Sequence, residues 1–209
     1  MKLQCVHFFK FLTTICAVVW RTTTQGQGAI TFDAHPNWIG TYYTESGMAF
    51  QLVVPQGQSL DYMGIVPPST YQGVPQDNNP FMWWLRQNNP YDYVSLSLTS
   101  EAQFGLTSVQ LADPNSPSSL AFPITFLGFK ADGLSVTNVF TTPGGGATTF
   151  ATYVFSPLFA SGLTSVDIIA PRWAMDNLVF TVPEPSSVVL AGLGLVVLRV
   201  RVVWKRRRA

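Results

Sequence analysis

Between residues 47 and 182 the chain is divided into short stretches in which apolar and polar residues alternate. This alternation constrains the fold strongly, because a period of two places apolar side chains on one face of a β-strand. A helix would need a period near 3.6, and no stretch of the body keeps one. Eight stretches are therefore predicted to be strands: 47–54, 93–98, 108–111, 124–130, 135–140, 149–155, 165–169 and 175–182.

Turn-forming residues separate these stretches at 113–115, 131–133 and 143–146. The turn at 131–133 (Ala-Asp-Gly) lies between two predicted strands, so residues 124–140 are expected to form a β-hairpin. Many short strands joined by regular turns are typical of an antiparallel sandwich. The predicted fold class is therefore all-β, with an antiparallel β-sandwich or jelly roll over residues 29–181.

Charge is segregated along the chain. Residues 29–181 hold three Lys or Arg and ten Asp or Glu, a formal charge of −7, while most basic residues lie at the two ends. An acidic body repels phosphate groups, which argues against a nucleic-acid partner. Both cysteines, Cys5 and Cys16, lie in the front segment, so a body without that segment has no thiol for a disulfide or a metal site.

Residues 1–28 are predicted to be a signal peptide. Lys2 precedes a mostly apolar run at 11–20, which is too short to cross a bilayer but suits the core of an export signal. Gly26 and Gly28 provide small residues at positions −3 and −1 of a cut before Ala29. The alternative is that this segment forms a buried amphipathic helix.

Residues 182–209 combine a turn signal, an apolar run and a basic cluster. The stretch 188–198 is uncharged, and the wider stretch 186–204 is interrupted only by the charges of Arg199 and Arg201, so it is predicted to be a single transmembrane helix. The basic cluster would remain cytoplasmic and stop translocation; it consists of Lys205, Arg206, Arg207 and Arg208. The alternative is a plain C-terminal anchor.

These three parts in this order resemble the PEP-CTERM sorting signal of exported bacterial proteins. The sorting motif would be Val182, Pro183, Glu184, Pro185 and Ser186. The resemblance implies recognition by exosortase, a membrane protease or transpeptidase, and cleavage near Pro-Glu-Pro. It also implies release or attachment outside the cell, after a membrane-anchored intermediate. Two prolines would keep this segment extended and accessible, because they remove amide donors.

The body resembles the jelly-roll domain often found ahead of such tails. The similar segments are ITFDAHP, YYTESGMAFQL, ITFLGFKADGLSVTNVF and WAMDNLVF. This domain is similar in shape to carbohydrate-binding modules. The resemblance further implies a structural Ca²⁺ near the terminal strands, where Asp33 and Asp176 are the candidate ligands, since Ca²⁺ prefers oxygen ligands. The alternative is that both carboxylates cap turns.

Aromatic residues flank a polar loop at 86–89. Aromatic faces stack on sugar rings while amide and carboxylate groups bond to hydroxyls, so this region is a candidate glycan contact. The residues concerned are Trp83, Trp84, Tyr91 and Tyr93. The alternative is that these aromatic residues belong to the core.

Catalytic groups are scarce in the body. Its one histidine, His35, lies in a turn-like segment, and the paired carboxylates of a glycoside hydrolase could come from Glu45 and Glu101. The sequence therefore predicts a non-enzymatic, exported structural or adhesive protein of the cell surface or extracellular matrix, linked to exopolysaccharide. The alternatives are a carbohydrate-binding module with a defined glycan ligand and a glycan-active hydrolase.

Overall fold

A computed structural model describes residues 25–55, 61–67, 79–85, 91–100, 102–113, 121–142 and 150–183. The predicted signal peptide up to residue 24, Glu101, and the tail from Glu184 onward, with its predicted transmembrane helix, lie outside the described residues. In the part of the chain that is described, no helix has both the length and the apolar character needed to cross a membrane.

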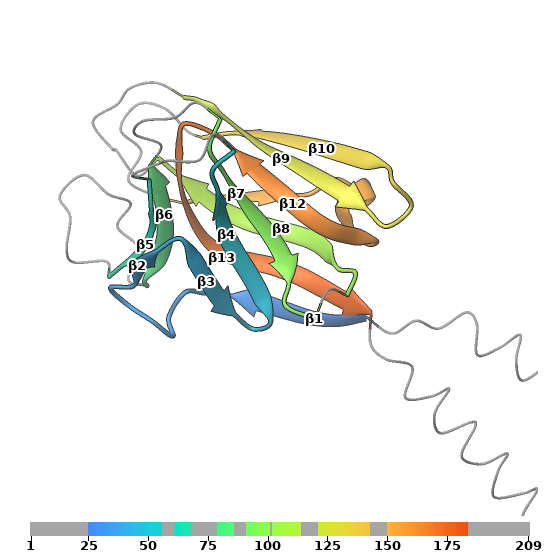
Figure 1. The fold of residues 1–209 in the computed structure, drawn as a ribbon, viewed down its shortest axis with the longest axis horizontal. Helices are drawn as coiled ribbons and strands as arrows, with labels where there is room; N and C mark the ends of the chain where they lie inside the picture. The colour runs from blue at the N-terminus through green and yellow to red at the C-terminus, as the bar shows by residue number, and fades with distance from the viewer. Residues whose placement is uncertain are drawn as a thin grey trace, which may run out of the picture. The chain divides into compact units, whose positions relative to one another are not determined.

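The described strands form two antiparallel sheets (Figure 1). The seven-stranded sheet has the order β11–β8–β13–β6–β5–β2, and β1 also pairs with β13. Its strands are β1 (Gln25–Ile30), β2 (Ile39–Gly40), β5 (Met63–Val66), β6 (Phe81–Leu85), β8 (Gly105–Ala112), β11 (Ala151–Val154) and β13 (Arg172–Pro183).

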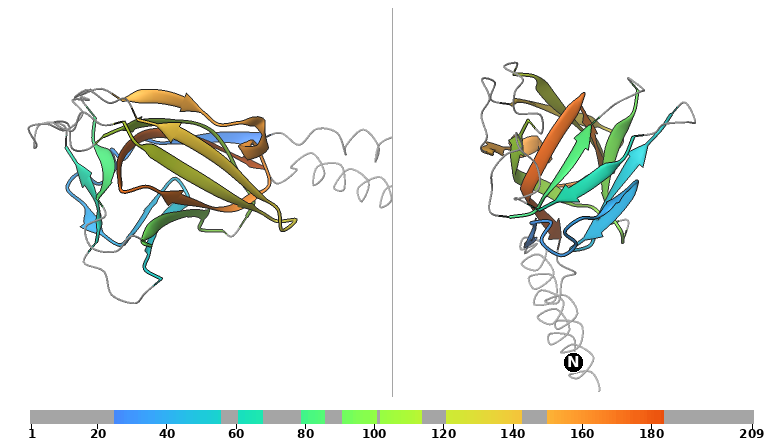
Figure 2. Two further views of the ribbon diagram at one scale, coloured as in Figure 1. Left: turned by 90° about the horizontal axis from the view of Figure 1, so that it is seen from above. Right: turned by 90° about the vertical axis from the view of Figure 1, so that its left-hand side faces the viewer.

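The six-stranded sheet has the order β10–β9–β12–β7–β4–β3. Its strands are β3 (Tyr42–Glu45), β4 (Met48–Val53), β7 (Tyr93–Leu98), β9 (Pro123–Lys130), β10 (Ser135–Thr141) and β12 (Leu163–Ile169). A short 3₁₀ helix, η1 (Pro157–Phe159), precedes β12. From β6 onward most connections cross from one sheet to the other, as in a jelly roll, so the predicted all-β sandwich is confirmed (Figure 2).

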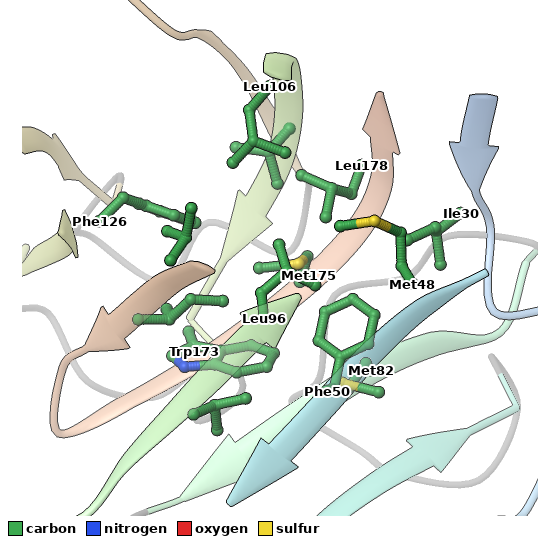
Figure 3. Close-up of a cluster of buried hydrophobic side chains, with 14 of the residues drawn as sticks. Ile30, Met48, Phe50, Met82, Leu96, Leu106, Phe126, Trp173, Met175 and Leu178 are labelled. Atoms are coloured by element: carbon green, nitrogen blue, oxygen red, sulfur yellow. The ribbon is translucent and has the colours of Figure 1, made fainter. Parts of the chain in front are cut away.

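The hydrophobic core lies between the sheets (Figure 3). In β7 and β12 the apolar residues at every second position are buried, while the residues between them remain partly accessible. Opposite them, β13 contributes Trp173, Met175 and Leu178. In these strands the apolar residues of the alternating pattern are therefore the ones that face the other sheet.

Two hairpins owe their geometry to residues with positive φ. The predicted hairpin is formed by β9 and β10, and Gly133 (φ 84°) in the turn between them donates its amide to the Lys130 carbonyl at 3.0 Å. The hairpin of β3 and β4 turns at Ser46 (φ 51°) and Gly47 (φ 80°), a pattern typical of a tight type I′ turn.

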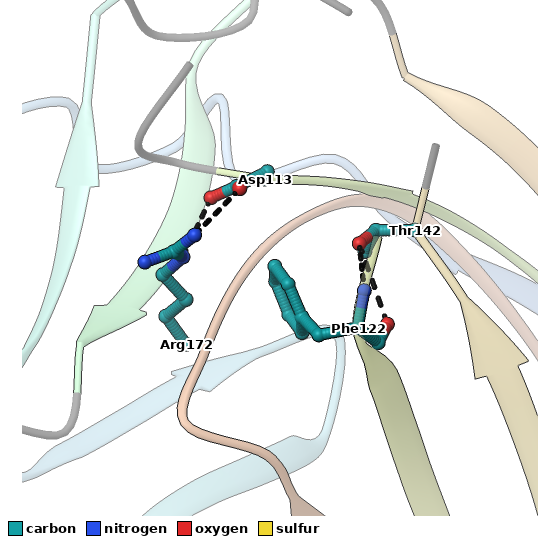
Figure 4. Close-up of polar contacts among 4 residues, drawn as sticks. All are labelled: Asp113, Phe122, Thr142 and Arg172. Atoms are coloured by element: carbon teal, nitrogen blue, oxygen red, sulfur yellow. Dashed lines mark hydrogen bonds and ion pairs between the residues drawn. The ribbon is translucent and has the colours of Figure 1, made fainter. Parts of the chain in front are cut away.

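An ion pair joins the end of β8 to the start of β13 (Figure 4). Arg172 Nε and Nη2 donate to the two carboxylate oxygens of Asp113 at 2.8 and 2.9 Å. The guanidinium carbon also lies 5.0 Å from the centre of the Phe122 ring. Thr142 exchanges hydrogen bonds with the backbone of Phe122 at 3.4 Å, so this corner ties together the ends of β8, β9, β10 and β13.

The predicted strand bounds hold best where the alternation is regular, and β7 coincides with the predicted 93–98. Five strands were not predicted: β1, β2, β3, β5 and β6. The compact body spans Gln27–Val182, and β1 and β13 extend beyond the predicted limits of 29 and 181. The positions at which the ends are processed stay predictions.

Candidate functional site

The face of the six-stranded sheet that points away from the core presents a continuous row of side chains. Residues that pair across neighbouring strands have their side chains on the same face of the sheet, so the cross-strand partners of Asp167 all point to this outer face. The pairing runs through Thr137, Leu127, Asp167, Ser95, Gln51 and Tyr42, one residue from each strand. Six strands about 4.8 Å apart give the row a length of about 24 Å, which suits an extended polymer better than a small molecule.

Asp167 lies near the middle of this row. Desolvation by the surrounding sheet raises the pKa of its carboxyl, and a hydrogen bond with the Ser95 side chain partly opposes that rise. Tyr93 belongs to the neighbouring strand, and burial together with the charge of Asp167 raises the pKa of its phenol. Asp167, Ser95 and Tyr93 therefore form a group of interacting polar side chains, called here the outer-face group.

Apolar and aromatic side chains flank this group. Phe129 and Ile169 on the outer face are more than a third exposed, and Tyr42 at the β3 edge is 54% exposed. Val139 on the β10 edge is also exposed. Flat or apolar surfaces next to hydrogen-bonding groups are the combination that a sugar polymer requires, since its rings have both apolar faces and hydroxyl edges.

The structure separates the four predicted glycan contacts. Tyr93 lies on the outer face of the six-stranded sheet, and Tyr91, just before it, is 60% exposed. Trp83 belongs to β6 of the other sheet, where its ring covers Gly64 and meets the Tyr62 ring at 81°. Trp84 is completely buried, with its ring centre 6.2 Å from that of Trp173. A buried ring cannot stack on a ligand, so the prediction for Trp84 is wrong.

The predicted calcium ligands have different environments. Asp33 is exposed in the turn after β1, whereas Asp176 is fully buried in β13. The carboxylate of Asp176 accepts hydrogen bonds from the backbone and side-chain amides of Asn177 at 2.7 and 2.8 Å. Asn177 (φ 46°) lies where the pairing of β13 with β8 shifts register. Within the described ranges, no group of three or more His, Cys, Asp or Glu is arranged to hold a metal ion, and calcium stays a prediction.

His35 and Glu45 both contact Tyr43 of β3. His35 is an exposed turn residue, as expected, and its ring packs edge-on against Tyr43. Glu45 accepts a hydrogen bond from the Thr31 amide at 3.0 Å and another from the Tyr43 hydroxyl at 2.5 Å. These contacts give Glu45 a role in joining the first turn of the body to β3.

The sequence indicates that Asp167 points away from the core, but it does not identify the neighbours of Asp167 on other strands. The pattern of 165–169 places Asp167 opposite in direction to the apolar Val166 and Ile168. The sequence did not reveal that Asp167 lies beside Ser95, because that contact depends on the register between β12 and β7. Tyr93 was predicted as a ligand contact for a different reason, its place near an aromatic loop.

The described part of the sorting motif is the end of β13. Val182 packs against the core, and Pro183 is exposed and is the last residue of the strand. Glu184, Pro185 and Ser186 lie outside the described residues, as do Lys205, Arg206, Arg207 and Arg208. The folded body therefore continues directly into the motif.

Several solved structures are similar in fold to the body. The chain covers 98% of the CBM22-1 xylan-binding domain from Paenibacillus barcinonensis Xyn10C, and the match includes 78% of this chain at 11% identity and a TM-score of 0.43. A family 11 carbohydrate-binding module from Clostridium thermocellum matches 75% of this chain and 96% of its own length at 13% identity, with a TM-score of 0.36.

The chain also spans 28% of the CBM22-1–GH10 structure of Clostridium thermocellum xylanase 10B, with 74% of this chain matched at 11% identity and a TM-score of 0.42. Likenesses at such scores identify neither a ligand nor an activity for this chain. No curated protein gives a significant match over the sequence. Residues 181–208 match the family model described as the PEP-CTERM protein-sorting motif, so the chain ends in a PEP-CTERM tail.

Proposed function

We propose that this chain is an exported, non-enzymatic protein of the cell surface or extracellular matrix, sorted by exosortase through its PEP-CTERM tail. The observation that carries the proposal is the match of residues 181–208 to the sorting motif, immediately after the last strand of a folded body. The motif favours a membrane-anchored intermediate, with the helix at 186–204 as its anchor and residues 1–28 as the export signal.

The end of β13 supports a cleavage position at or after Pro183. Val182 packs against the core, so a cut before it would remove a structural residue, whereas Pro183 is exposed. Proline cannot donate a hydrogen bond to a neighbouring strand, so the chain can leave the sheet here. Processing at this point would release the body without disturbing its fold.

The body is proposed to contact extracellular polysaccharide through the outer face of the six-stranded sheet. The row through Asp167 and Ser95, with Tyr93 and Phe129 beside it, supplies hydrogen-bonding groups next to aromatic surface. A carbohydrate-binding module with one defined ligand is the alternative. A glycan-active hydrolase is favoured less, because both carboxylate oxygens of Glu45 already bond to Thr31 and Tyr43.

The sorting proposal is tested by intact mass spectrometry of the protein from its native cell, separated into membrane and medium fractions. The expected species lacks both ends and terminates close to Pro183. A Glu184→Ala, Pro185→Ala variant should accumulate with its tail intact, while a Leu134→Ala variant, changed at an exposed turn residue, should be processed normally. Wild-type protein found only in the membrane fraction with an intact C-terminus would refute exosortase handling.

A further inference from the structure

The outer face of the six-stranded sheet carries a single fixed charge. Across the six strands, all of which are described, Asp167 is the only charged side chain at an outward position. The other two charged residues of these strands do not point outward. Lys130, the last residue of β9, points to the face opposite to that of Phe129. Glu45 accepts hydrogen bonds from Thr31 and Tyr43. Within these six strands, an anionic group thus lies near the centre of the face without a basic side chain at another outward position.

The setting of Asp167 makes this charge effective. Solvent screens exposed charges strongly, but Asp167 is only partly exposed. This partial burial removes some of the water around its carboxyl and raises its pKa. Ser95 donates a hydrogen bond to the carboxylate and so holds it in position. The ring of Tyr93 lies next to it, and aromatic faces attract cations as well as sugar C–H groups.

The whole body reinforces the preference for a cation. With three basic and ten acidic residues between 29 and 181, the body repels polyanions at a distance before any contact forms. A polysaccharide with uronate or sulfate groups would bring anions toward Asp167. A polysaccharide with protonated amines would instead supply the missing counter-charge, and its rings could lie along the row of about 24 Å.

We propose that the outer face of the six-stranded sheet binds an amino-sugar polysaccharide with free, protonated amines, and that Asp167 is the residue that selects for them. This inference rests on the proposed contact with polysaccharide and names its chemical class. Asp167 is a specificity residue, and Tyr93 supplies the aromatic surface beside it.

The test uses two oligosaccharides of equal length that differ in charge, a glucosamine hexamer and an N-acetylglucosamine hexamer. Binding to the full-length chain in nonionic detergent is measured by calorimetry at about pH 6, which is about two units above the pKa of an ordinary Asp and so allows for the raised pKa of Asp167. The expected result is binding of the glucosamine hexamer about fivefold tighter than its acetylated counterpart, because an exposed ion pair is worth up to about 1 kcal/mol. Added salt should remove this preference.

Matched variants locate the effect. Asp167→Asn should abolish the preference, whereas Asp132→Asn, which removes the same charge from the β9–β10 turn, should keep it. Tyr93→Ala should weaken binding of both hexamers, and Tyr91→Ala should not. Circular dichroism checks that each variant is folded.

Two results would overturn the inference in distinguishable ways. Equal binding of both hexamers, with Tyr93→Ala weakening both and Asp167→Asn weakening neither, would refute the selection for amines and leave the polysaccharide contact standing. Absence of binding to both hexamers, and to neutral and acidic polysaccharides screened in the same way, would refute the contact itself together with the inference.

Discussion

Replacing Arg172 by methionine should destabilise the body substantially, because it would remove the guanidinium that bonds to both oxygens of the buried Asp113 carboxylate. The Asp113 side chain is only 5% exposed, while that of Arg172 is 21% exposed. Removing one partner of a buried pair costs about 3–5 kcal/mol, and the partial exposure of Arg172 lowers the expected loss to about 2–3 kcal/mol. Loss of the contact with the Phe122 ring adds about 0.5 kcal/mol.

For a body of this size, 1 kcal/mol corresponds to about 2–4 °C in Tm, so the Arg172→Met variant should melt about 5–14 °C lower. Adding Asp113→Asn should recover most of this loss, because it removes the negative charge that the buried Asp113 carboxylate would otherwise carry without the guanidinium of residue 172. Urea unfolding followed by tryptophan fluorescence gives the free energies for the double-mutant cycle. A loss below about 1 kcal/mol, or additive effects of the two substitutions, would refute the view that this pair acts as a buried unit.

Three further changes test other features of the fold. Gly105→Ala should lower stability by at least about 2 kcal/mol, because its Cβ would lie 2.0 Å from the Ala160 carbonyl oxygen; unchanged thermal unfolding would contradict this packing. Burial first, and then the hydrogen bond and charge of Glu45, raise the pKa of Tyr43, so its contribution to stability is complete below about pH 10 and declines at higher pH. Urea unfolding at neutral and at strongly alkaline pH should therefore show a larger alkaline loss in wild type than in Tyr43→Phe, and equal losses would count against this explanation. Asp92→Asn should raise stability by about 1–3 kcal/mol, because both carboxylate oxygens of Asp92 are buried with no hydrogen-bond partner in the described part of the chain; a lower Tm would show that the charge is compensated.

The sequence predicted the strands whose two faces differ. In β7 and β12 one face meets the core and the other meets solvent. Apolar and polar residues therefore alternate along these strands, and this alternation can be seen in the sequence. β6 reads FMWWL without alternation, because Trp84 faces the main core while Phe81 and Trp83 pack in a second apolar cluster on the other side. β1 reads QGQGAI, and its glycines and glutamines resemble a linker more than a strand.

The candidate site depended on information that a single sequence does not hold. Tyr93 could be selected for its place beside a polar loop flanked by aromatic residues. Its partners could not be selected, because Asp167 is 74 positions away along the chain and meets β7 only through strand register. Trp84 was misassigned because a sequence shows that two neighbouring strand residues point in opposite directions without showing which one faces inward. The sorting tail needed no such information, since its parts are contiguous.

The position of β13 has a mechanical consequence for a protein attached through its C-terminal end. β13 pairs with β8, β6 and β1, so it has neighbours along both of its edges and is the strand that runs into the tail. A pull on the tail would load this strand along its axis, and the lateral hydrogen bonds on both sides would resist together in shear. An edge strand would instead peel away one bond at a time. If the body is held through its C-terminal end, the connectivity of the sandwich therefore places the load on a strand that is hydrogen-bonded along both edges.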